Sequence, residues 1–474
     1  MTSKIVIEPV TRVEGHGKVT IQLDDRGEVS EAKLHVTEFR GFEKFCEGRL
    51  FWEMPVITSR ICGICPVSHH LASAKAGDAL LGVEIPPTAK LLRRLLHMAQ
   101  YLQSHSLHFF HLASPDLLLG MDVEPAKRNV IGLIAEKPEV AVKGVMLRKF
   151  GQEIIEILGD KKVHPLAAVP GGMTKALSRE GREKILRQVD NAIADVQFAI
   201  ALIKDYYGQH GTQTRDFASF PTNYMGLVDQ GKLELYDGKL RLKDSKGAIL
   251  EDGVEPQDYL SIIEERVEDW SYLKFPFYKK RGYPGGIYRV GPLGRLNVAD
   301  GITTPLAQKE FQDFQKLGKN GVVEGSLYYH YARMVEALYA AEQIRLLAED
   351  GRICSTEIRT DSATLNEEGV GVVEAPRGTL IHHYWIDNRG QVRKVNLIVA
   401  TGNNNAAMNK AVEQVARGYV RGMKPAEGLL NRVEAAIRCY DPCFSCATHA
   451  LGRMPLAVEF VSVSGEVIER FYRG

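Results

Sequence analysis

Two Cys-x-x-Cys pairs at nearly opposite ends of the sequence place the strongest constraint on how this chain can fold. The first pair is Cys62 and Cys65, and the second is Cys443 and Cys446, in a chain of 474 residues. In a reducing compartment, thiols at this spacing more often bind a metal or carry out redox chemistry than form a cross-link. If both pairs serve one site, the fold must bring them together in its interior.

Two simpler interpretations of these pairs fit the spacing less well. A structural zinc ribbon places its second pair about 15 to 20 residues after the first, whereas almost the whole chain separates the pairs here. A thioredoxin-like dithiol requires a βαβ context, which neither pair has. Structural zinc stays open as an alternative that metal analysis would detect. Seven cysteines are an odd number, which argues against a disulfide framework, and we expect the remaining three to be buried thiols: Cys46, Cys354 and Cys439.

The composition excludes several classes of protein. Lys and Arg total 60 against 59 Asp and Glu, so the formal net charge is +1 and no basic block is available for nucleic acid or an acidic membrane. No uninterrupted apolar run reaches the length of about 18 residues that a spanning helix needs, and the start MTSKIVIEPV lacks a signal-peptide core. We expect a soluble, cytoplasmic protein with one large domain or two subdomains.

Apolar periodicity predicts a mainly α fold with small β elements, an α+β architecture with a core of long helices. Alternation over residues 19–23 and 32–36, separated by a turn at 24–27, predicts an N-terminal antiparallel sheet. Helical spacing follows Pro86, begins again near Ser178, and recurs over residues 327–347 and 406–418. Asp237-Gly238 between two alternating runs predicts a hairpin on a surface excursion.

Six segments around the cysteines carry a resemblance to a known family. RICGICPVSH spans residues 60–69 and DPCFSCATH spans residues 441–449, and TRVEGH lies at residues 11–16. RGFE at 40–43, His164-Pro165 with the PGG of 170–172, and APRG at 375–378 extend the match along the chain. Together these segments resemble the large, catalytic subunit of nickel-iron hydrogenases. The sequences of these segments are most similar to those of the cytoplasmic, NAD-coupled bidirectional branch.

The resemblance implies the nickel-iron hydrogenase large-subunit fold and a role for each cysteine. Cys62 and Cys443 would be terminal nickel ligands, while Cys65 and Cys446 would bridge nickel to an iron carrying carbon monoxide and cyanide. The chemistry is compatible with this arrangement, because splitting dihydrogen needs an electron-rich metal pair and a nearby base to accept the proton. The implied activity is reversible conversion of dihydrogen into protons and electrons.

Several further residues match family positions around that centre. Glu14 matches the glutamate that passes protons between Cys443 and the surface; the alternative is an exposed glutamate paired with Arg12. Arg377 resembles the arginine above the open metal position, with Pro376 beside it, and the alternative is a surface arginine in a Pro-Gly turn. Thr401 corresponds to a hydroxyl that donates to a cyanide.

Three more residues would support this site from outside it. Asp116 and Asp441 resemble carboxylates that orient Arg377, although a turn cap is the simpler role for Asp441. His69 would hydrogen-bond a bridging sulfur, or would be an ordinary buried imidazole. By contrast, the histidines at steps of three along one helix lack a ligand motif, and we expect packing roles for them: His105, His108 and His111.

The resemblance also implies a magnesium site near the end of the chain. Glu43 and His449 match family ligands, and a backbone carbonyl, placed at Leu397, would join them. Magnesium prefers oxygen ligands, so the imidazole is unusual on chemistry alone.

Electrons from the centre would have to leave through other chains. After four cysteines are assigned, three remain, which is fewer than an ordinary iron-sulfur cluster requires. No G-x-G-x-x-G fingerprint is present, so we expect no iron-sulfur cluster, flavin or NAD on this chain. The resemblance implies a diaphorase module that carries flavin and NAD, together with an iron-sulfur small subunit.

Maturation factors are implied as well. In the family, nickel-insertion chaperones load the metal and an endopeptidase then cuts behind the histidine that matches His449. Residues 1–449 would form the catalytic domain, and residues 450–474 an extension that is removed. Residues 456–461 form a plausible strand within this extension, which could hold an immature site open by pairing with another element.

Two other functions compete with this interpretation. A non-catalytic scaffold like the related subunit of respiratory complex I has lost the four-thiolate set that is intact here. A hydrogenase that reduces the deazaflavin F420 would differ in its electron-transfer partner, and an assay with either acceptor distinguishes the two.

Overall fold

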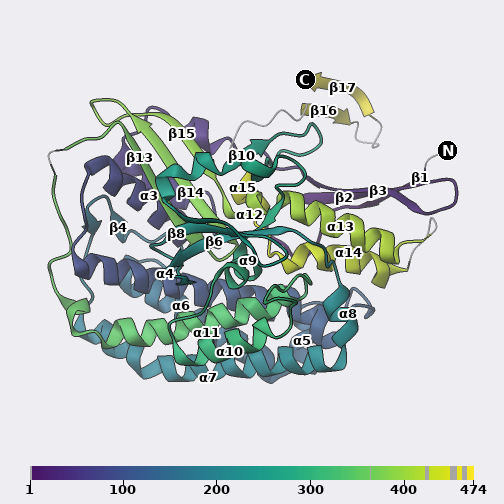
Figure 1. The fold of residues 1–474 in the computed structure, drawn as a ribbon, viewed down its shortest axis with the longest axis horizontal. Helices are drawn as coiled ribbons and strands as arrows, with labels where there is room; N and C mark the ends of the chain where they lie inside the picture. Colours follow the sequence, from purple (N-terminus) through teal and green to yellow (C-terminus); the bar gives the residue numbers. More distant parts are fainter. Residues whose placement is uncertain (1–2, 363, 422–425, 449–455, 462–466, 474) are drawn as a thin grey trace.

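The computed structural model describes residues 3–362, 364–421, 426–448, 456–461 and 467–473. Long helices form one layer of the molecule, below a sheet that is covered by a further helix (Figure 1). The long helices are α4 (Pro87–Leu107), α6 (Pro138–Gly159), α7 (Arg179–Gln209) and α11 (Tyr328–Glu349). The predicted mainly α fold with small sheets is confirmed. No described helix is both long and apolar enough to cross a membrane.

The four helices expected from periodicity are present near their predicted bounds. Pro87 opens α4, where its missing N–H costs nothing. Ser178 caps α7 by accepting the backbone N–H of Gly181. α11 covers the predicted 327–347 segment, and α13 (Asn405–Tyr419) covers the 406–418 segment.

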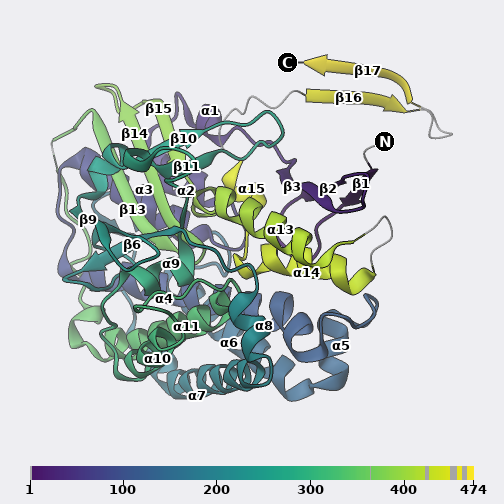
Figure 2. The same cartoon turned by 45° about the vertical axis from the view of Figure 1, so that its right-hand side comes forward.

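The N-terminal antiparallel sheet is also confirmed. It consists of β1 (Ser3–Ile7), β2 (Gly17–Leu23) and β3 (Val29–Val36), paired in that order. Its alternating apolar residues are buried, and α13 packs against β3. Figure 2 shows this sheet beside α13 and α14 (Glu427–Cys439), at one end of the body.

A second antiparallel sheet, β13 (Glu368–Ala375), β14 (Gly378–Ile386) and β15 (Val392–Ile398), positions the motif segments. α3 (Pro66–Leu81) packs on β13 and β14, so its first turn lies near the turn that joins these two strands. Cys65 precedes α3, and Arg377 lies in that turn. Segments far apart in sequence therefore meet at one end of the sheet.

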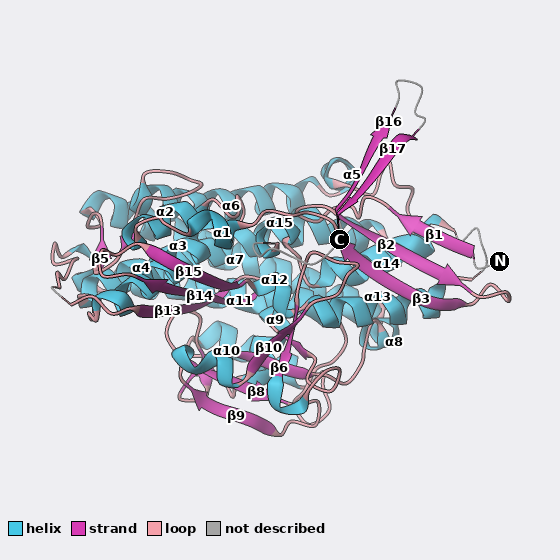
Figure 3. Cartoon of the chain, turned by 90° about the horizontal axis from the view of Figure 1, so that it is seen from above, coloured by secondary structure: helices cyan, strands magenta, loops and turns pink. Residues whose placement is uncertain are grey.

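The remaining elements complete the two layers, with a five-stranded sheet on a separate side (Figure 3). That sheet contains β6 (Asn223–Asp229), β7 (Lys232–Leu233), β8 (Lys239–Lys243), β9 (Ile249–Val254) and β12 (Tyr288–Arg289). The short strands elsewhere are β4 (Ala168–Val169), β5 (Gly172–Met173), β10 (Ile263–Arg266) and β11 (Phe275–Tyr278). The shorter helices are α1 (Phe42–Cys46), α2 (Met54–Ser59), α5 (Val130–Glu136), α8 (Gly211–Asp216), α9 (Gly291–Val298), α10 (Pro305–Gln315), α12 (Ala400–Asn403) and α15 (Phe444–Ala447). Single turns and π-helical segments are η1 (Phe51–Glu53), η2 (His108–Ala113), η3 (Pro115–Leu119), η4 (Pro256–Ser261), η5 (Lys279–Arg281) and η6 (Gly351–Cys354).

The hairpin predicted at Asp237-Gly238 is wrong. β8 pairs with β6 and β9, and the chain reverses at residues 230–231 and 244–248 instead. The Glu234 carboxylate accepts three successive backbone N–H groups, from residues 235–237, and Lys75 donates to Asp237. These contacts fold residues 234–238 into a loop against the body. The loop is no surface excursion, because Leu235 and Tyr236 are buried.

The strand predicted within the C-terminal extension is confirmed as β16 (Leu456–Val461). It pairs antiparallel with β17 (Val467–Arg473), as its neighbour in a two-stranded sheet. Figure 2 shows this hairpin apart from the helical body. The predicted boundary behind His449 lies outside the described residues.

A buried ion cluster holds the turn that carries Arg377. Arg295 on α9 uses all five of its N–H groups: three reach the carboxylates of Glu336 and Glu374, and two reach the carbonyls of the two residues before Arg377. The three charged side chains are fully buried. Burial raises the pKa of Glu374, while Arg295 outweighs burial at Glu336 and lowers its pKa. The cluster therefore fixes a backbone segment that the site needs.

We expect Arg295→Met to lower the free energy of unfolding by about 3–5 kcal/mol, because it leaves two buried carboxylates without the arginine that pairs with both. Urea unfolding of the purified chain measures this. Arg215→Met is the matched control: Arg215 pairs with Asp216 at the surface, where solvent screens the pair, so its loss should change the free energy of unfolding little. Equal losses in both variants would show that the buried cluster has no special role.

Candidate metal centre

Three segments that are distant in sequence meet at the two cysteine pairs. Cys65 precedes the first turn of α3, and Cys443 precedes α15. Glu14 forms a parallel backbone bridge with Cys443, and Phe444 donates its N–H to the Glu14 carbonyl at 3.0 Å. At Gly15 the backbone has a φ of +83°, and a Cβ there would lie 2.8 Å from the nitrogen of Ser445. Glycine therefore permits this close approach.

The four sulfur atoms form one compact buried cluster. Cys62 Sγ lies 3.3 Å from Cys443 Sγ, Cys65 Sγ lies 3.9 Å from Cys446 Sγ, and all four lie within 4.8 Å of one another. A disulfide would place two sulfurs about 2.05 Å apart. Thiolates at about 2.3 Å from one tetrahedral metal ion are separated by about 3.8 Å. The spacing therefore matches ligands around a shared metal centre.

The cluster contains thiols of unequal acidity. Hydrogen bonds from Cys443 and Cys446 lower the pKa of Cys65 to about 6. Burial opposes ionisation of Cys62, but hydrogen bonds from the neighbouring thiols lower its pKa well below the usual value. Burial raises the pKa of Cys443 and of Cys446. Because metal ligation requires thiolates, binding would release protons from the second pair.

Glu14 lies directly against the cluster. Cys443 Sγ is 2.8 Å from Glu14 Oε2, and the backbone N–H of Ser445 donates to the same oxygen at 3.3 Å. The Ser445 hydroxyl donates to the other oxygen. The alternative pairing of Glu14 with Arg12 is wrong, because Arg12 pairs with Asp116 instead. A carboxylate in contact with a thiol can accept and release its proton.

Arg377 also lies beside the cluster. It is buried and donates to Asp441 Oδ1 at 3.0 Å and to Ser104 Oγ at 3.2 Å. Burial raises the pKa of Asp441 to about 6, although the arginine beside it acts in the other direction. Arg377 lines a narrow cavity with the cysteines Cys65, Cys443 and Cys446. The alternative of a surface arginine is therefore wrong.

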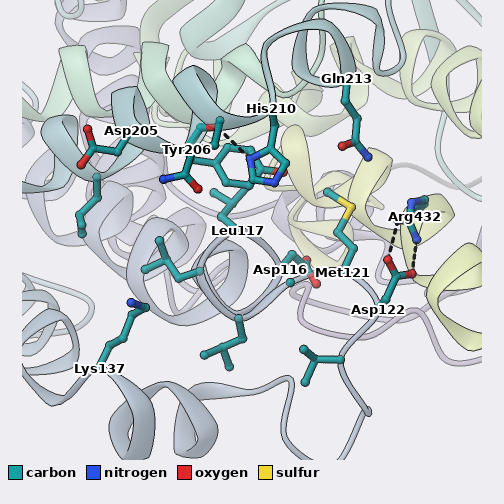
Figure 4. A pocket seen from close by; sticks show the side chains of 16 residues that line it. Asp116, Leu117, Met121, Asp122, Lys137, Asp205, Tyr206, His210, Gln213 and Arg432 are labelled. Atoms are coloured by element: carbon teal, nitrogen blue, oxygen red, sulfur yellow. Dashed lines mark hydrogen bonds and ion pairs between the residues drawn. The ribbon is translucent and has the colours of Figure 1, made fainter.

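Asp116 lies elsewhere, so its predicted contact with Arg377 is wrong. It is buried between Arg12 and Arg438, at 2.5 Å and 2.9 Å from their guanidinium nitrogens. It also lines a cavity of about 730 Å³ whose wall carries the Asp122–Arg432 ion pair (Figure 4). Arg12 and Arg438 bind different oxygens of this carboxylate, so Asp441 alone of the two predicted carboxylates pairs with Arg377.

Thr401 and His69 both lie at the narrow cavity. Thr401 Oγ1 accepts the backbone N–H of Cys443 at 3.0 Å, which holds the second cysteine loop. His69 is fully buried, and its Nδ1 lies 3.1 Å from His382 Nε2. Its other ring nitrogen, Nε2, is buried without a hydrogen-bond partner in the described part of the chain.

The predicted magnesium ligands are placed only in part. Glu43 Oε1 accepts the backbone N–H of Leu397 at 2.8 Å, and burial raises the pKa of Glu43. α1 and β15 are therefore adjacent, as the predicted site requires. His449 lies outside the described residues.

The remaining histidines and cysteines behave largely as predicted. His105 contacts Glu336, and His108 donates to the carbonyl of Arg438, so both have packing partners. Cys46 and Cys439 are buried, but Cys354 is half-exposed, which corrects the expectation of three buried thiols. Four residues that hold the site residues in place were not predicted. No motif marks Ser104, Arg295 or His382, and Ser445 lies inside the second cysteine motif but was given no role there.

The residues present fit a bimetallic centre with soft ligands. Four thiolates suit nickel and iron, and their separations suit a shared metal centre. The unpartnered His69 Nε2 in the same cavity offers a hydrogen-bonding group to whatever occupies it. Buried polar atoms are usually satisfied, so this one indicates a missing partner.

Comparison with known proteins identifies the family. The nickel-dependent hydrogenase family matches residues 40–131 and 227–449, and a HoxL-like family matches residues 4–39. The chain is 46% identical to the NAD-reducing hydrogenase HoxS subunit beta of Cupriavidus necator, over 99% of each chain. It is 44% identical to a chain of the F420-non-reducing hydrogenase vhc of Methanococcus voltae, over 96% of each chain.

Solved structures agree with these matches. An NAD+-reducing NiFe-hydrogenase in the H2-reduced state superposes with a TM-score of 0.92 at 49% identity, covering 94% of this chain and 99% of that one. A Ni-Fe-Se hydrogenase from D. vulgaris Hildenborough shares the fold, with a TM-score of 0.77 at 24% identity over 95% of this chain and all of that one. The chain that brings its four distant cysteines into one cluster belongs to the nickel-dependent hydrogenase family.

Proposed function

We propose that this chain is the catalytic subunit of a nickel-iron hydrogenase that converts dihydrogen reversibly into protons and electrons. The convergence of four buried thiols beside Glu14 is the single observation that carries this function. Family membership and the 46% identity to an NAD-reducing hydrogenase subunit support it.

The chain's own residues divide the work around the bound metals. Nickel and iron would be held by the four thiols Cys62, Cys65, Cys443 and Cys446. When bound, these metals would accept the electrons of dihydrogen. Cys443 would take the proton from the substrate, and Glu14 would remove it, because the sulfur and the carboxylate are in contact. Arg377 would place a fixed positive charge over the cavity, held there by Asp441.

The finer composition of the centre follows from the family resemblance. The iron would carry carbon monoxide and cyanide, with Thr401 and Arg377 as donors to the cyanides and Pro376 beside them. Glu43, the carbonyl of Leu397 and His449 would bind magnesium. The adjacency of Glu43 and Leu397 supports this second site.

We further propose NAD as the final electron acceptor in a cytoplasmic complex. An iron-sulfur small subunit would receive the electrons, and a diaphorase module with flavin would reduce NAD. The identity to a NAD-reducing hydrogenase subunit over nearly the whole chain supports this assignment. The alternative acceptor F420 is less well supported, because several archaeal relatives carry the name F420-non-reducing hydrogenase. The complete set of four thiols argues against a complex-I-like scaffold.

Co-purification of the complex followed by hydrogen-dependent NAD reduction tests the function. Nickel and iron should be present, and NAD rather than F420 should be reduced. Zinc at stoichiometry, with nickel and iron absent from matured protein, would favour the structural-zinc alternative.

We expect Glu14→Gln to retain nickel but to lose hydrogen oxidation by about 10²–10⁴-fold, because glutamine keeps the shape but cannot carry a proton. Metal analysis and hydrogen-dependent NAD reduction measure the two properties. Glu310→Gln, a half-buried glutamate that accepts from Tyr331, is the control and should keep full activity. Full activity of Glu14→Gln would exclude Glu14 from the proton route.

The C-terminal extension should be absent from the active enzyme. We propose that nickel-insertion chaperones load the centre and that an endopeptidase then cuts behind His449, removing residues 450–474. Mass spectrometry of the purified active enzyme measures this. An active chain that still ends at Gly474 would refute the processing step.

A further inference from the structure

A chain of four buried polar side chains leads away from the metal centre. His69 Nδ1 lies 3.1 Å from His382 Nε2, and His382 Nδ1 lies 2.6 Å from the Tyr384 hydroxyl. Tyr384 donates in turn to Ser73 Oγ at 2.9 Å. All four side chains are at most 1% exposed. No motif in the sequence marks this chain of contacts.

The fold brings these residues together through two periodicities. His69 and Ser73 are four residues apart on α3, so they lie on one face of that helix. His382 and Tyr384 are two residues apart on β14, so they lie on one face of that strand. Since α3 packs on β14, the two pairs interleave into one continuous series of contacts.

The hydrogen bonds have a definite direction. The Tyr384 hydroxyl donates its hydrogen to Ser73 Oγ. The hydroxyl oxygen of Tyr384 therefore accepts the hydrogen bond from His382 Nδ1. A neutral imidazole has only one N–H, and a charged imidazole without a counter-charge is costly in a fully buried position. His382 Nε2 therefore accepts, and His69 Nδ1 donates to it.

This direction leaves one ring nitrogen of His69 for the metal centre. His69 Nε2 is buried without a partner in the described residues, and His69 lines the narrow cavity with Cys65 and Cys446. Groups behind a site residue commonly fix its tautomer and its ring orientation. The series of contacts does this for His69.

We propose that His382 and Tyr384 are positioning residues that fix the ring of His69 and keep its proton on Nδ1, so that Nε2 presents a lone pair, and no N–H, to the cavity that Cys65 and Cys446 line. This inference rests on the proposed function. It extends the site to two residues of β14 that do not touch the cysteines. The competing explanation is that Tyr384 fills space in the core.

Tyr384→Phe separates these explanations, because phenylalanine fills nearly the same volume but cannot accept from His382. Without that acceptor, His382 can carry its proton on Nε2, which moves the proton of His69 to its own Nε2. Infrared spectra of the iron-bound carbon monoxide and cyanide, recorded on the matured complex, report the change as a shift of the bands. A hydrogen bond to a sulfur that holds the iron would change the electron density that the iron passes to these ligands.

Tyr224→Phe is the matched control. Tyr224 is also fully buried, and its hydroxyl donates to a backbone carbonyl, that of Val323. We expect shifted bands in Tyr384→Phe and wild-type bands in Tyr224→Phe. Wild-type bands in both variants overturn the proposal. If Tyr384→Phe alone fails to acquire nickel while its melting temperature matches that of Tyr224→Phe, the proposal is supported; equal loss of nickel in both overturns it.

His382→Gln provides a second, independent test. It breaks the link between Tyr384 and His69, so it should shift the bands, and adding Tyr384→Phe to it should cause no further shift. Additive shifts would contradict a single connected series. Absence of carbon monoxide and cyanide bands from the wild-type complex would count against the proposed function instead, so the two failures are distinguishable.

Discussion

The meeting of two cysteine pairs in one buried cluster is the constraint on which the rest of the structure depends. Cys62 and Cys65 lie just before α3, whereas Cys443 precedes α15 and Cys446 lies within it, and neither segment forms a cluster alone. Backbone contacts at Glu14 join the N-terminus to the second pair. The helices and sheets therefore hold three short segments, those of Glu14 and of the two cysteine pairs, at hydrogen-bonding distance from one another. Without a metal, four adjacent sulfurs contribute little free energy to folding. The arrangement is therefore best understood as a set of metal ligands.

Buried ion pairs between arginines and carboxylates lie around this cluster. Arg377 faces the thiols and is paired with Asp441, while Arg295 holds the backbone just before Arg377. Each of these arginines is thus fixed by buried carboxylates: Asp441 holds Arg377, and Glu336 and Glu374 hold Arg295. Buried ion pairs contribute little net stability, which suggests that geometry at the site is what they provide.

Periodicity, a local property, was sufficient to predict α4, α7, α11 and the N-terminal sheet, but not α6. The cysteine cluster joins segments from opposite ends of the chain, and the family resemblance implied it. The sequence was insufficient wherever a side chain had several partners to choose from. Asp116 was placed beside Arg377, but Arg12 and Arg438 hold it elsewhere. The predicted Asp237-Gly238 hairpin does not form, because contacts from Glu234 and Lys75 hold this segment as a loop. His382 and Tyr384 carry no motif, so only the packing of α3 on β14 reveals them.

X-ray absorption at the nickel edge, measured on the matured complex, tests the central claim most directly. We expect nickel surrounded by thiolate sulfur with an iron neighbour, and loss of that signal when any one of the four cysteines is replaced by serine. A nickel environment without sulfur, or a signal that survives replacement of Cys62 or Cys443, would contradict it.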